Sequence, residues 1–493
     1  MGGTGKSEVI KAFMFFVRTI TKMVDWKFDQ DVIKITALTG AAACEIPNGR
    51  TLHSQACLNV PRKLNQDHRT SWKSTKMLII DEISFLSCEL IEKLDKHMRS
   101  LKEVSDEMFG GIHVVFVGDF FQLLPVGAQT ALFQRNTVQF GAINKAVFLN
   151  KSHRFQKDPD YGEIMRRFRK GEVTKEDLKT LNTRFIECPE VVLPPITELR
   201  CACYRNTERN SYNNVIFLQH LAATHTKTDD YSTECPSHTC IIKATMRYKL
   251  KRRGAINPTM YNRILDECGD CDIRNPADKF VDPALKFFHG IPLMMNTNDR
   301  IEERLANGTP CNGMYIKLKD GCHFQKEMWE GYMVNTVMVT EVEYVLCAKE
   351  TDGKKPPEYF IVEPCESLCQ VSIPLLNNKR TEKIRVTHFP LNCNISTTGH
   401  KLQGKTLDSL VVNSWAYGHT HWVYVVLSRV KTLKSLIFNE KLNEDREYPA
   451  NNDLIRWEQR IKDTIERQTF RGRGEGDYNR YLLEEREHQT GIE

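Results

Sequence analysis

The chain has 493 residues, of which 41% are hydrophobic and 27% charged, and its formal net charge is +6. The length predicts about three domains, and the apolar content excludes a disordered tail. The mild positive charge is compatible with a polyanionic partner but is also common among metabolic enzymes. Sixteen cysteines without a regular framework favour reduced thiols over a disulfide scaffold. Lys11 and Arg18 interrupt the short apolar stretch Val9–Ile20, so no membrane association is expected.

The first half of the chain alternates predicted helices and strands. A helical run extends from Lys6 to about Val24. Apolar stretches that predict buried strands follow at Val32–Leu38, Met77–Ile80 and Ile112–Val117. Repeated strand, polar loop and helix indicate a parallel sheet with helices on both faces. Ligands bind such sheets at the carboxyl ends of the strands, which is where Asp81, Glu82 and Asp119 stand.

The second half of the chain has weaker periodicity. Residues 198–209 predict a strand and a loop, and residues 320–392 predict a small β-rich insert between Gly and Pro clusters. Strands are predicted again at Ser409–Asn413 and Val423–Leu427. Residues 451–493 are charged, and they predict a packed helix followed by a solvated tail. The residues of this helix that share one face are Leu454, Trp457, Ile461 and Ile465.

A glycine-rich segment at the amino terminus has the residue types of a phosphate-binding loop. Its residues are Gly2, Gly3, Thr4, Gly5, Lys6 and Ser7. Glycines let backbone N–H groups turn toward phosphates, and the following helix adds the positive end of its dipole. Lys6 would reach the β- and γ-phosphates of ATP, and the Ser7 hydroxyl would bind Mg²⁺. The alternative is a glycine-rich terminus without a function.

The full phosphate-loop pattern requires one more glycine and a preceding strand, at places that fall ahead of Met1. We therefore expect the first strand and the start of the loop to be missing from this sequence. The absence of a central strand would leave backbone groups of its neighbours unpaired. ATP binding by the chain as written is then expected to be impaired.

Two further strand ends supply polar groups that such a loop needs. An apolar strand runs into Asp81 and Glu82. Asp81 would complete the Mg²⁺ shell, and Glu82 would polarise the attacking water. Gln122, after the third strand, can hydrogen-bond both the γ-phosphate and that water. The alternatives are a pair of acids at a helix amino terminus and a solvated glutamine in a turn.

These motifs, with others later in the chain, resemble those of the Pif-one family of superfamily 1B DNA helicases, which includes helicase domains of Helitron transposons. The resemblance extends from Gly2 to about Phe438 and rests on the type, order and spacing of the motifs. Apart from the phosphate loop, the Asp81-Glu82-Ile83-Ser84 box and Gln122, the matching segments are Ala37–Ala43, Gly49–Ser54, Asn150–Phe155, Asn307–Thr309, Thr398–Gly404 and Tyr424–Arg429.

The resemblance implies roles for particular residues. Arg154 and Arg429 would place positive charge on the developing phosphoryl oxygens. Gln403 joins Lys6, Glu82 and Gln122 as an implied catalytic residue. The implied DNA contacts are Thr39, His53, Ser54, Thr398, His400 and Lys401. If the two arginines come from different lobes, binding of ATP would close the cleft between the lobes. If the two lobes hold the DNA alternately, each closure would move the protein one step along the strand.

We therefore expect an α/β fold of two RecA-like P-loop NTPase domains with parallel sheets. The first would cover residues 1–186, with a short wedge-like insert at about 58–74. The second would cover residues 187–450 and contain the β-rich insert at about 320–392, which the resemblance implies is SH3-like. Residues 451–493 would form the charged helical tail.

The predicted function is an ATP-dependent DNA helicase that uses ATP and Mg²⁺ to move along single-stranded DNA and unwind duplexes. The resemblance implies 5′-to-3′ movement, action on DNA junctions, and roles in DNA repair, recombination and telomere maintenance. One alternative is a nucleic-acid clamp that no longer hydrolyses ATP, and another is the helicase module of a Helitron-type transposase. RNA is a lesser alternative as the substrate. We expect a monomer in the nucleus, with the cytoplasm and the mitochondrion as alternative locations.

Three weaker patterns have competing interpretations. Cys268 and Cys271, with Cys235 and Cys240, could bind zinc, although free thiols are favoured because the spacing is loose. The His419-Thr420-His421 segment faintly resembles the paired histidines of rolling-circle nucleases, which is disfavoured because it lies between two helicase motifs. The basic run Arg166–Lys170 predicts either a phosphate-contacting face or a solvated helix face.

Overall fold

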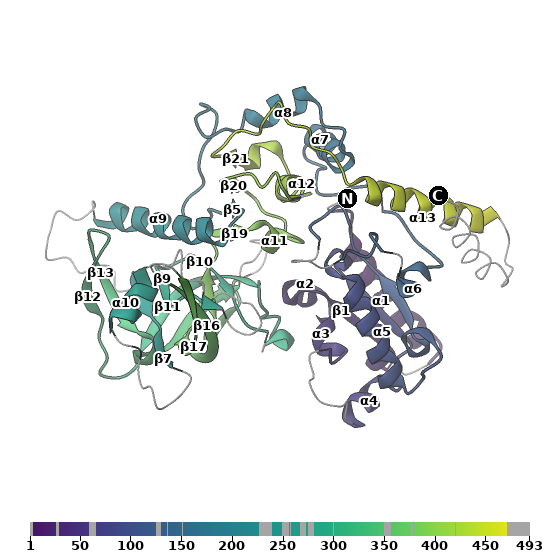
Figure 1. The fold of residues 1–493 in the computed structure, drawn as a ribbon, viewed down its shortest axis with the longest axis horizontal. Coiled ribbons are helices and arrows are strands. Elements are labelled where there is room, and N and C mark those ends of the chain that lie inside the picture. The colour runs from purple at the N-terminus through teal and green to yellow at the C-terminus, as the bar shows by residue number, and fades with distance from the viewer. Residues whose placement is uncertain are drawn as a thin grey trace.

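Two α/β lobes form the body of the molecule, and a group of mostly antiparallel strands extends from the second (Figure 1). The first lobe lies at the lower right of Figure 1, the second lobe at the top, and the antiparallel strands at the lower left. The computed structural model describes residues 3–25, 29–58, 66–124, 130–135, 137–149, 151–225, 239–248, 256, 258–266, 273–274, 281–298, 300–349, 356–375, 378–419 and 421–470.

The first lobe contains a four-stranded parallel sheet in the order β2-β1-β3-β4. Its central strands, β1 (Ile33–Ala37) and β3 (Met77–Asp81), are almost completely buried. The outer strands of the described sheet are β2 (Arg50–Thr51) and β4 (His113–Phe116). The three strands predicted in this half of the chain are confirmed, as is the parallel sheet.

Helices cover the first sheet because their apolar stripes match its buried faces. Ile10 and Met14 of α1 (Lys6–Met23) belong to one cluster with Ile33, Ile35 and Ile79 of the sheet. The other helices of this lobe are α2 (Gly40–Glu45), α3 (Leu52–Gln55), α4 (Gln66–Trp72), α5 (Cys88–Lys102) and α6 (Val138–Gly141). Within the predicted wedge at 58–74, residues 59–65 lie outside the described residues and residues 66–72 form α4.

The second lobe contains another parallel sheet, in the order β19-β5-β20-β21. Its strands are β5 (Cys201–Cys203), β19 (Ser396–Thr398), β20 (Leu410–Val412) and β21 (Leu436–Phe438). Helices α9 (Asn206–His225) and α11 (Gly399–Leu402) follow β5 and β19 directly. The strand predicted at 409–413 is confirmed, whereas the loop predicted up to residue 209 is already helical from Asn206.

The strand predicted at Val423–Leu427 is wrong, because these residues belong to α12 (Trp422–Leu427). All six side chains of α12 are buried. Backbone hydrogen bonds of the α-helical type confirm the helix: Val425 N donates to His421 O at 2.8 Å, and Ser428 N donates to Tyr424 O at 2.9 Å. A short apolar run that is buried on every side has no amphipathic period, so its β-branched valines favoured a strand in the sequence.

Residues 158–186 pack onto the second lobe. They contain α7 (Pro159–Lys170) and α8 (Lys175–Asn182). Tyr161 Oη donates to Leu427 O at 2.6 Å, and Arg184 Nε donates to Leu436 O at 2.9 Å. Contacts to the second sheet and to α12 thus begin near residue 161, and the domain boundary at residue 186 stays a prediction.

The antiparallel strands lie between residues 240 and 393, a wider range than the insert predicted at about 320–392. They form three sheets in the orders β15-β14-β11-β10-β18, β12-β13-β6-β9 and β7-β17-β16-β8. The SH3-like architecture of the insert stays a prediction. The elements are β6 (Cys240–Lys243), β7 (Thr245–Tyr248), α10 (Pro258–Asp266), β8 (Ile273–Arg274), β9 (Ala284–Phe287), β10 (Ile291–Met295), β11 (Pro310–Leu318), β12 (Gln325–Trp329), β13 (Tyr332–Met338), β14 (Val342–Lys349), β15 (Tyr359–Val362), β16 (Cys365–Leu375), β17 (Asn378–His388) and β18 (Leu391–Cys393).

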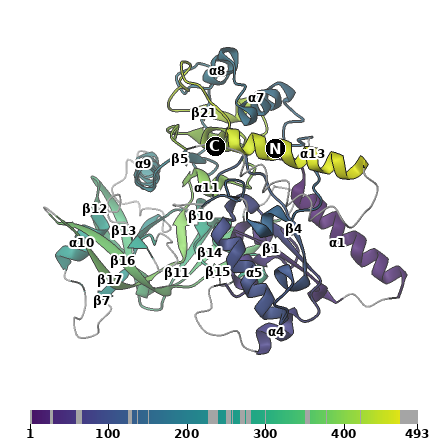
Figure 2. The same cartoon turned by 45° about the vertical axis from the view of Figure 1, so that its right-hand side comes forward.

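The last described element, α13 (Asn452–Phe470), leaves the second lobe and runs across the first (Figures 1 and 2). Leu454 is completely buried in the main core, and Trp457 packs against that core. The packed helix predicted for this part of the sequence is confirmed, while the predicted tail at 471–493 lies outside the described residues. Among the described helices, none has the length and apolar character needed to cross a membrane.

Candidate active site

The glycine-rich segment forms a tight turn into α1. Gly3 and Gly5 have φ angles of 74° and 82°, in the left-handed region that favours glycine. A Cβ atom on Gly5 would meet no other atom within 4 Å, so open space lies beside the turn. Gly5 caps α1 without a side-chain hydrogen bond, which leaves N–H groups of the first turn for a ligand. The turn suits phosphate, and Gly2 lies outside the described residues.

The first acid at the end of β3, Asp81, lies beside the phosphate loop. Its side chain is buried and accepts a hydrogen bond from Ser7, with Lys6 close enough to interact electrostatically. Burial, and then the neighbouring charge of Glu82, raise the pKa of Asp81 to about 6, against the opposing effects of Lys6 and Ser7. The structure thus brings together the two residues predicted to bind the metal.

A magnesium ion fits this donor set. Mg²⁺ prefers oxygen ligands and usually takes only one or two from protein, with phosphates and waters as the rest. Ser7 and Asp81 supply such oxygens, and a cation would relieve the repulsion between the carboxylates of Asp81 and Glu82 that raises the Asp81 pKa. Across the described residues no group of three or more His, Cys, Asp or Glu side chains suits a metal held by protein alone.

Glu82 is held in an unusual backbone conformation at the junction of the lobes. Its φ and ψ are 57° and 44°, and its N–H donates to Asp81 Oδ1 at 2.8 Å. Non-glycine residues in this region cost of order 1–3 kcal/mol and persist where surrounding contacts hold them. From the second lobe, Gln403 Nε2 donates to Glu82 Oε2 at 3.2 Å. The backbone of Glu82 is therefore held within the first lobe, while its carboxylate, which is predicted to polarise water, is held by Gln403 of the second lobe.

Gln403 makes two further hydrogen bonds to the first lobe. Its Nε2 donates to Ser84 Oγ at 2.8 Å, and its Oε1 accepts from Leu123 N at 3.0 Å. Gln403 stands directly after α11 of the second lobe. A single side chain therefore ties the end of α11 to the loops that follow β3 and β4.

Gln122 lies buried in the loop after β4. Among the described residues its Oε1 has no hydrogen-bond partner. Buried acceptors are normally paired, so an unpaired one in a candidate site indicates a ligand or a water. This position fits the predicted contact of Gln122 with an attacking water.

Arg154 and Arg429 lie together where the two lobes meet. The backbone next to Arg154 bonds to the phosphate loop, where His153 N donates to Gly3 O at 2.8 Å, while the Arg154 side chain reaches the second lobe. Arg154 donates to Ser428 O at 2.5 Å and to Lys405 O at 3.4 Å. Arg429 donates to Val425 O at 2.6 Å and to Lys405 O at 3.5 Å. Burial, with Arg154 nearby, lowers the pKa of Arg429 to about 9, while Glu82 acts in the opposite direction. The two arginines share a carbonyl rather than facing one another across a cleft.

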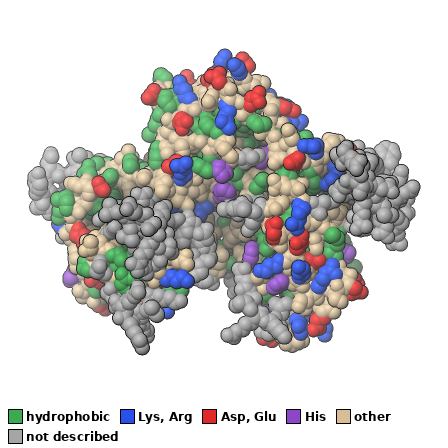
Figure 3. All heavy atoms as spheres, viewed as in Figure 1, with side chains coloured by type: hydrophobic (Ala, Val, Ile, Leu, Met, Phe, Trp, Pro, Cys, Tyr) green, Lys and Arg blue, Asp and Glu red, His purple; other side chains and the backbone are tan. Residues whose placement is uncertain are grey.

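The predicted DNA contacts divide between the lobes. Thr39 caps α2, and its Oγ1 accepts from Ala42 N at 3.2 Å. His53 and Ser54 belong to α3 of the first lobe, while Thr398, His400 and Lys401 stand at α11 of the second lobe. Burial lowers the pKa values of His53 and His400, so both rings are favoured in the neutral state. Histidine side chains gather near the centre of the face shown in Figure 3, where the lobes meet.

The weaker sequence patterns gain no support. His419 hydrogen-bonds to Tyr204, whereas the buried His421 ring packs on Phe121 with centroids 5.7 Å apart, so the two histidines do not form a pair. Cys240 is buried in β6, and the three other cysteines of the proposed zinc group lie outside the described residues. Those cysteines are Cys235, Cys268 and Cys271.

Arg169 is a site residue that sequence reasoning missed. It was assigned to a basic run on a phosphate-contacting or solvated face, yet only 19% of its side chain is exposed. Arg169 forms an ion pair with Asp119 at 3.3 Å, and its guanidinium lies 3.9 Å from the centroid of Phe121. Arg169 and Lys6 are among the positive charges that hold the pKa of Asp119 below its usual range, although burial alone would raise it. The sequence does contain one indication that Arg169 is buried, because Arg169 directly follows Phe168, which belongs to the buried face of α7.

Comparison with known proteins agrees with this geometry. Residues 1–177 match the model of the family described as PIF1-like helicase. The chain is 33% identical over 239 residues to the ATP-dependent DNA helicase RRM3 of Saccharomyces cerevisiae, covering 44% of this chain and 30% of RRM3. It is 32% identical over 235 residues to the ATP-dependent DNA helicase PIF1 of Candida albicans, covering 42% and 24%.

Residues 1–177 are similar in sequence to the PIF1-like helicases, and most of the chain is similar in fold to solved Pif1 helicases. The crystal structure of Pif1 helicase from Candida albicans matches with a TM-score of 0.63 and 21% identity, over 94% of each chain. The structure of Bacteroides Pif1 bound to ssDNA matches with a TM-score of 0.61 and 20% identity, over 94% of this chain and 92% of that one. The PIF1-like resemblance and the fold of two RecA-like lobes are thus confirmed. The chain spans less than a third of the length of RRM3 and of Candida PIF1.

Proposed function

We propose that the chain is the motor of an ATP-dependent DNA helicase, which hydrolyses ATP to move along single-stranded DNA. The contact that supports this most is the bridge from Gln403 of the second lobe to Glu82 and to Leu123 N in the first. A hydrolytic carboxylate of one lobe that is held by a side chain of the other can act only when the lobes are correctly placed. ATP turnover is thereby coupled to the movement that a motor requires.

The side chains have separate tasks in this reaction. Lys6 and the turn of Gly3 to Gly5 would hold the phosphates, and Glu82 would accept a hydrogen bond from the attacking water and polarise it. The free acceptor of Gln122 would orient the same water. Mg²⁺, held by Ser7 and Asp81, would neutralise charge on the phosphates when bound.

Arg154 and Arg429 would stabilise the charge that develops on the γ-phosphoryl oxygens. Both guanidinium groups are buried, and each lies close enough to Glu82 for electrostatic interaction. Two neighbouring buried cations favour the binding of an anion such as a nucleoside triphosphate, because the anion offsets their mutual repulsion. Nucleotide binding would thereby strengthen the contact between the lobes.

Single-stranded DNA is the proposed track. One fold neighbour is Bacteroides Pif1 bound to ssDNA, and another structure is described as two coordinating Pif1 helicases unwinding forked dsDNA. Residues with hydroxyl and basic groups stand on both lobes, at Thr39 and His53 in the first and at Thr398 and Lys401 in the second. If the two lobes bind the DNA backbone alternately as the cleft closes and opens, the protein would move in steps along one strand. We propose 5′-to-3′ movement on the basis of the family resemblance alone.

The proposal is tested by measuring ATPase activity with and without single-stranded DNA. Lys6→Ala should remove DNA-stimulated turnover, because the γ-phosphate loses its lysine. The matched control is Lys11→Ala on the same helix, where Lys11 forms an exposed ion pair with Glu8 at 2.7 Å and should be dispensable. Binding of DNA without turnover by the unaltered chain would contradict the motor and favour a nucleic-acid clamp.

A further inference from the structure

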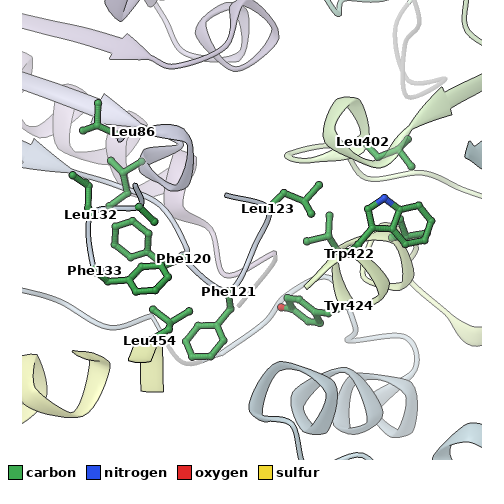
Figure 4. Packing of buried hydrophobic residues seen from close by; sticks show 14 of the residues in the cluster. Leu86, Phe120, Phe121, Leu123, Leu132, Phe133, Leu402, Trp422, Tyr424 and Leu454 are labelled. Atoms are coloured by element: carbon green, nitrogen blue, oxygen red, sulfur yellow. The ribbon is translucent and has the colours of Figure 1, made fainter. Parts of the chain in front are cut away.

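The loop that carries Gln122 has little structure of its own and depends on contacts from distant elements. We call residues 118–123 the Gln122 loop. Inside the loop, Phe121 N donates to Asp119 Oδ1 at 3.2 Å and Gln122 N donates to Asp119 O at 3.1 Å. Figure 4 shows Phe120 and Phe121 on one side, near Leu454, and Leu123 on the other, facing Leu402, Trp422 and Tyr424. Neighbours from three other parts of the chain therefore surround the loop.

Helix α13 contributes an aromatic contact to this loop. The Trp457 ring meets Phe120 edge to face, with centroids 5.2 Å apart and planes at 86°. The same ring stacks on Phe140 of α6, with centroids 5.5 Å apart and planes at 13°. Edge-to-face and stacked aromatic pairs attract one another beyond the effect of the area that they bury. Phe120 and Phe140 also meet directly, with centroids 5.7 Å apart, so Trp457 completes a three-ring cluster that attaches α13 to the Gln122 loop and α6.

A charged contact fixes the other aromatic side chain of the loop. Arg169 of α7 stacks on Phe121 and forms ion pairs with Asp119, at 3.3 Å, and with Glu458 of α13, at 3.6 Å. The exposed fractions of the Arg169, Asp119 and Glu458 side chains are 19%, 3% and 17%. Ion pairs this well shielded from water are screened little and hold a defined geometry. Because α7 packs on the second lobe, this cluster also connects the two lobes.

We propose that α13 is a strap that positions Gln122 for ATP hydrolysis. The positioning residues are Trp457 of α13 itself and Arg169 of α7, which Glu458 of α13 holds. The inference rests on the proposed function. Trp457 and Arg169 grip the two aromatic residues immediately before Gln122, so their loss would free the loop to move. Displacement of a catalytic group by about 1 Å can slow a reaction by about 10²-fold. Helix α13 would thereby control turnover at the nucleotide site.

The inference is tested in the full chain with Trp457→Ala and Glu458→Gln, and with Ile455→Ala as the control. Ile455 lies on the same helix, and 40% of its surface is exposed. We expect the kcat of DNA-stimulated ATPase to fall between about tenfold and 10²-fold in Trp457→Ala. The KM for ATP and the affinity for single-stranded DNA should change little, and Trp457→Phe should restore most of the turnover. A general loss of stability would instead change all these quantities together.

Amide hydrogen exchange separates this inference from the proposed function, because it requires no turnover. Residues 118–123 should exchange faster in Trp457→Ala and Glu458→Gln than in the unaltered chain, while β1 and β3 stay protected. Equal exchange of these residues in all variants would overturn the strap. If the unaltered chain lacks ATPase activity but Trp457→Ala still loosens the loop, the proposed function fails and the positioning contact stands.

Discussion

At the residue scale, the environment assigns different tasks to two adjacent carboxylates. Asp81 is buried beside Ser7. Burial makes its negative charge unfavourable, so a nearby cation is favoured. Glu82 points toward the second lobe and is held by Gln403, with a backbone conformation that few side chains adopt. The first is suited to binding a metal and the second to acting on water.

Glu82→Gln should slow ATP hydrolysis by about 10²- to 10⁴-fold, because the amide cannot polarise the attacking water. The amide keeps the size of the side chain, so binding of ATP and DNA should be retained. Steady-state ATPase assays and fluorescence anisotropy with labelled single-stranded DNA measure the two effects. Turnover near that of the unaltered chain would remove Glu82 from the catalytic residues.

Mg²⁺ binding should depend on pH through Asp81. The pKa of this carboxyl is raised to about 6, so it is charged above that pH and protonated and neutral below it. Because the metal competes with the proton, the apparent Mg²⁺ affinity should fall by about tenfold for each pH unit below 6. Titration of ATP binding with Mg²⁺ at several pH values measures this, and Asp81→Asn should remove the dependence. An affinity that does not change across this range would contradict the metal role.

At the element scale, the site residues that the sequence predicts are those at the ends of parallel strands. The acids after β3 and the glutamine after β4 were found because each follows a clear apolar strand. The helix α12 was missed because complete burial hides its period. Arg169 was missed because its partner Asp119 lies 50 residues away, and spacing along the chain does not predict such a pair.

Gln403→Ala should uncouple the end of α11 from the first lobe. The change removes the hydrogen bonds to Glu82, Ser84 and Leu123, including a partially buried bond to a charged group. Such bonds contribute about 1.5–3 kcal/mol each when one partner is charged. We expect kcat to fall by at least about tenfold. Gln156→Ala, at an exposed glutamine bonded to His153, is the control, and equal loss in both variants would argue against a specific bridge.

At the scale of the whole molecule, the chain crosses between lobes more often than the sequence indicates. Residues 158–186 pack on the second sheet, and α13 returns to the first lobe. The order of the motifs assigns residues 158–186 to the first domain and α13 to a separate tail, because it uses only their position in the sequence. Their real places depend on long-range packing, such as Trp457 against Phe120 and Phe140, which no local pattern reveals.

The measurement that tests the central claim most directly is strand separation of a labelled duplex with a single-stranded tail. The account predicts unwinding that requires ATP, occurs with a 5′ tail and not with a 3′ tail, and disappears in Lys6→Ala. ATPase activity without unwinding on any tailed or forked duplex would show that hydrolysis is not coupled to movement, and it would contradict the account.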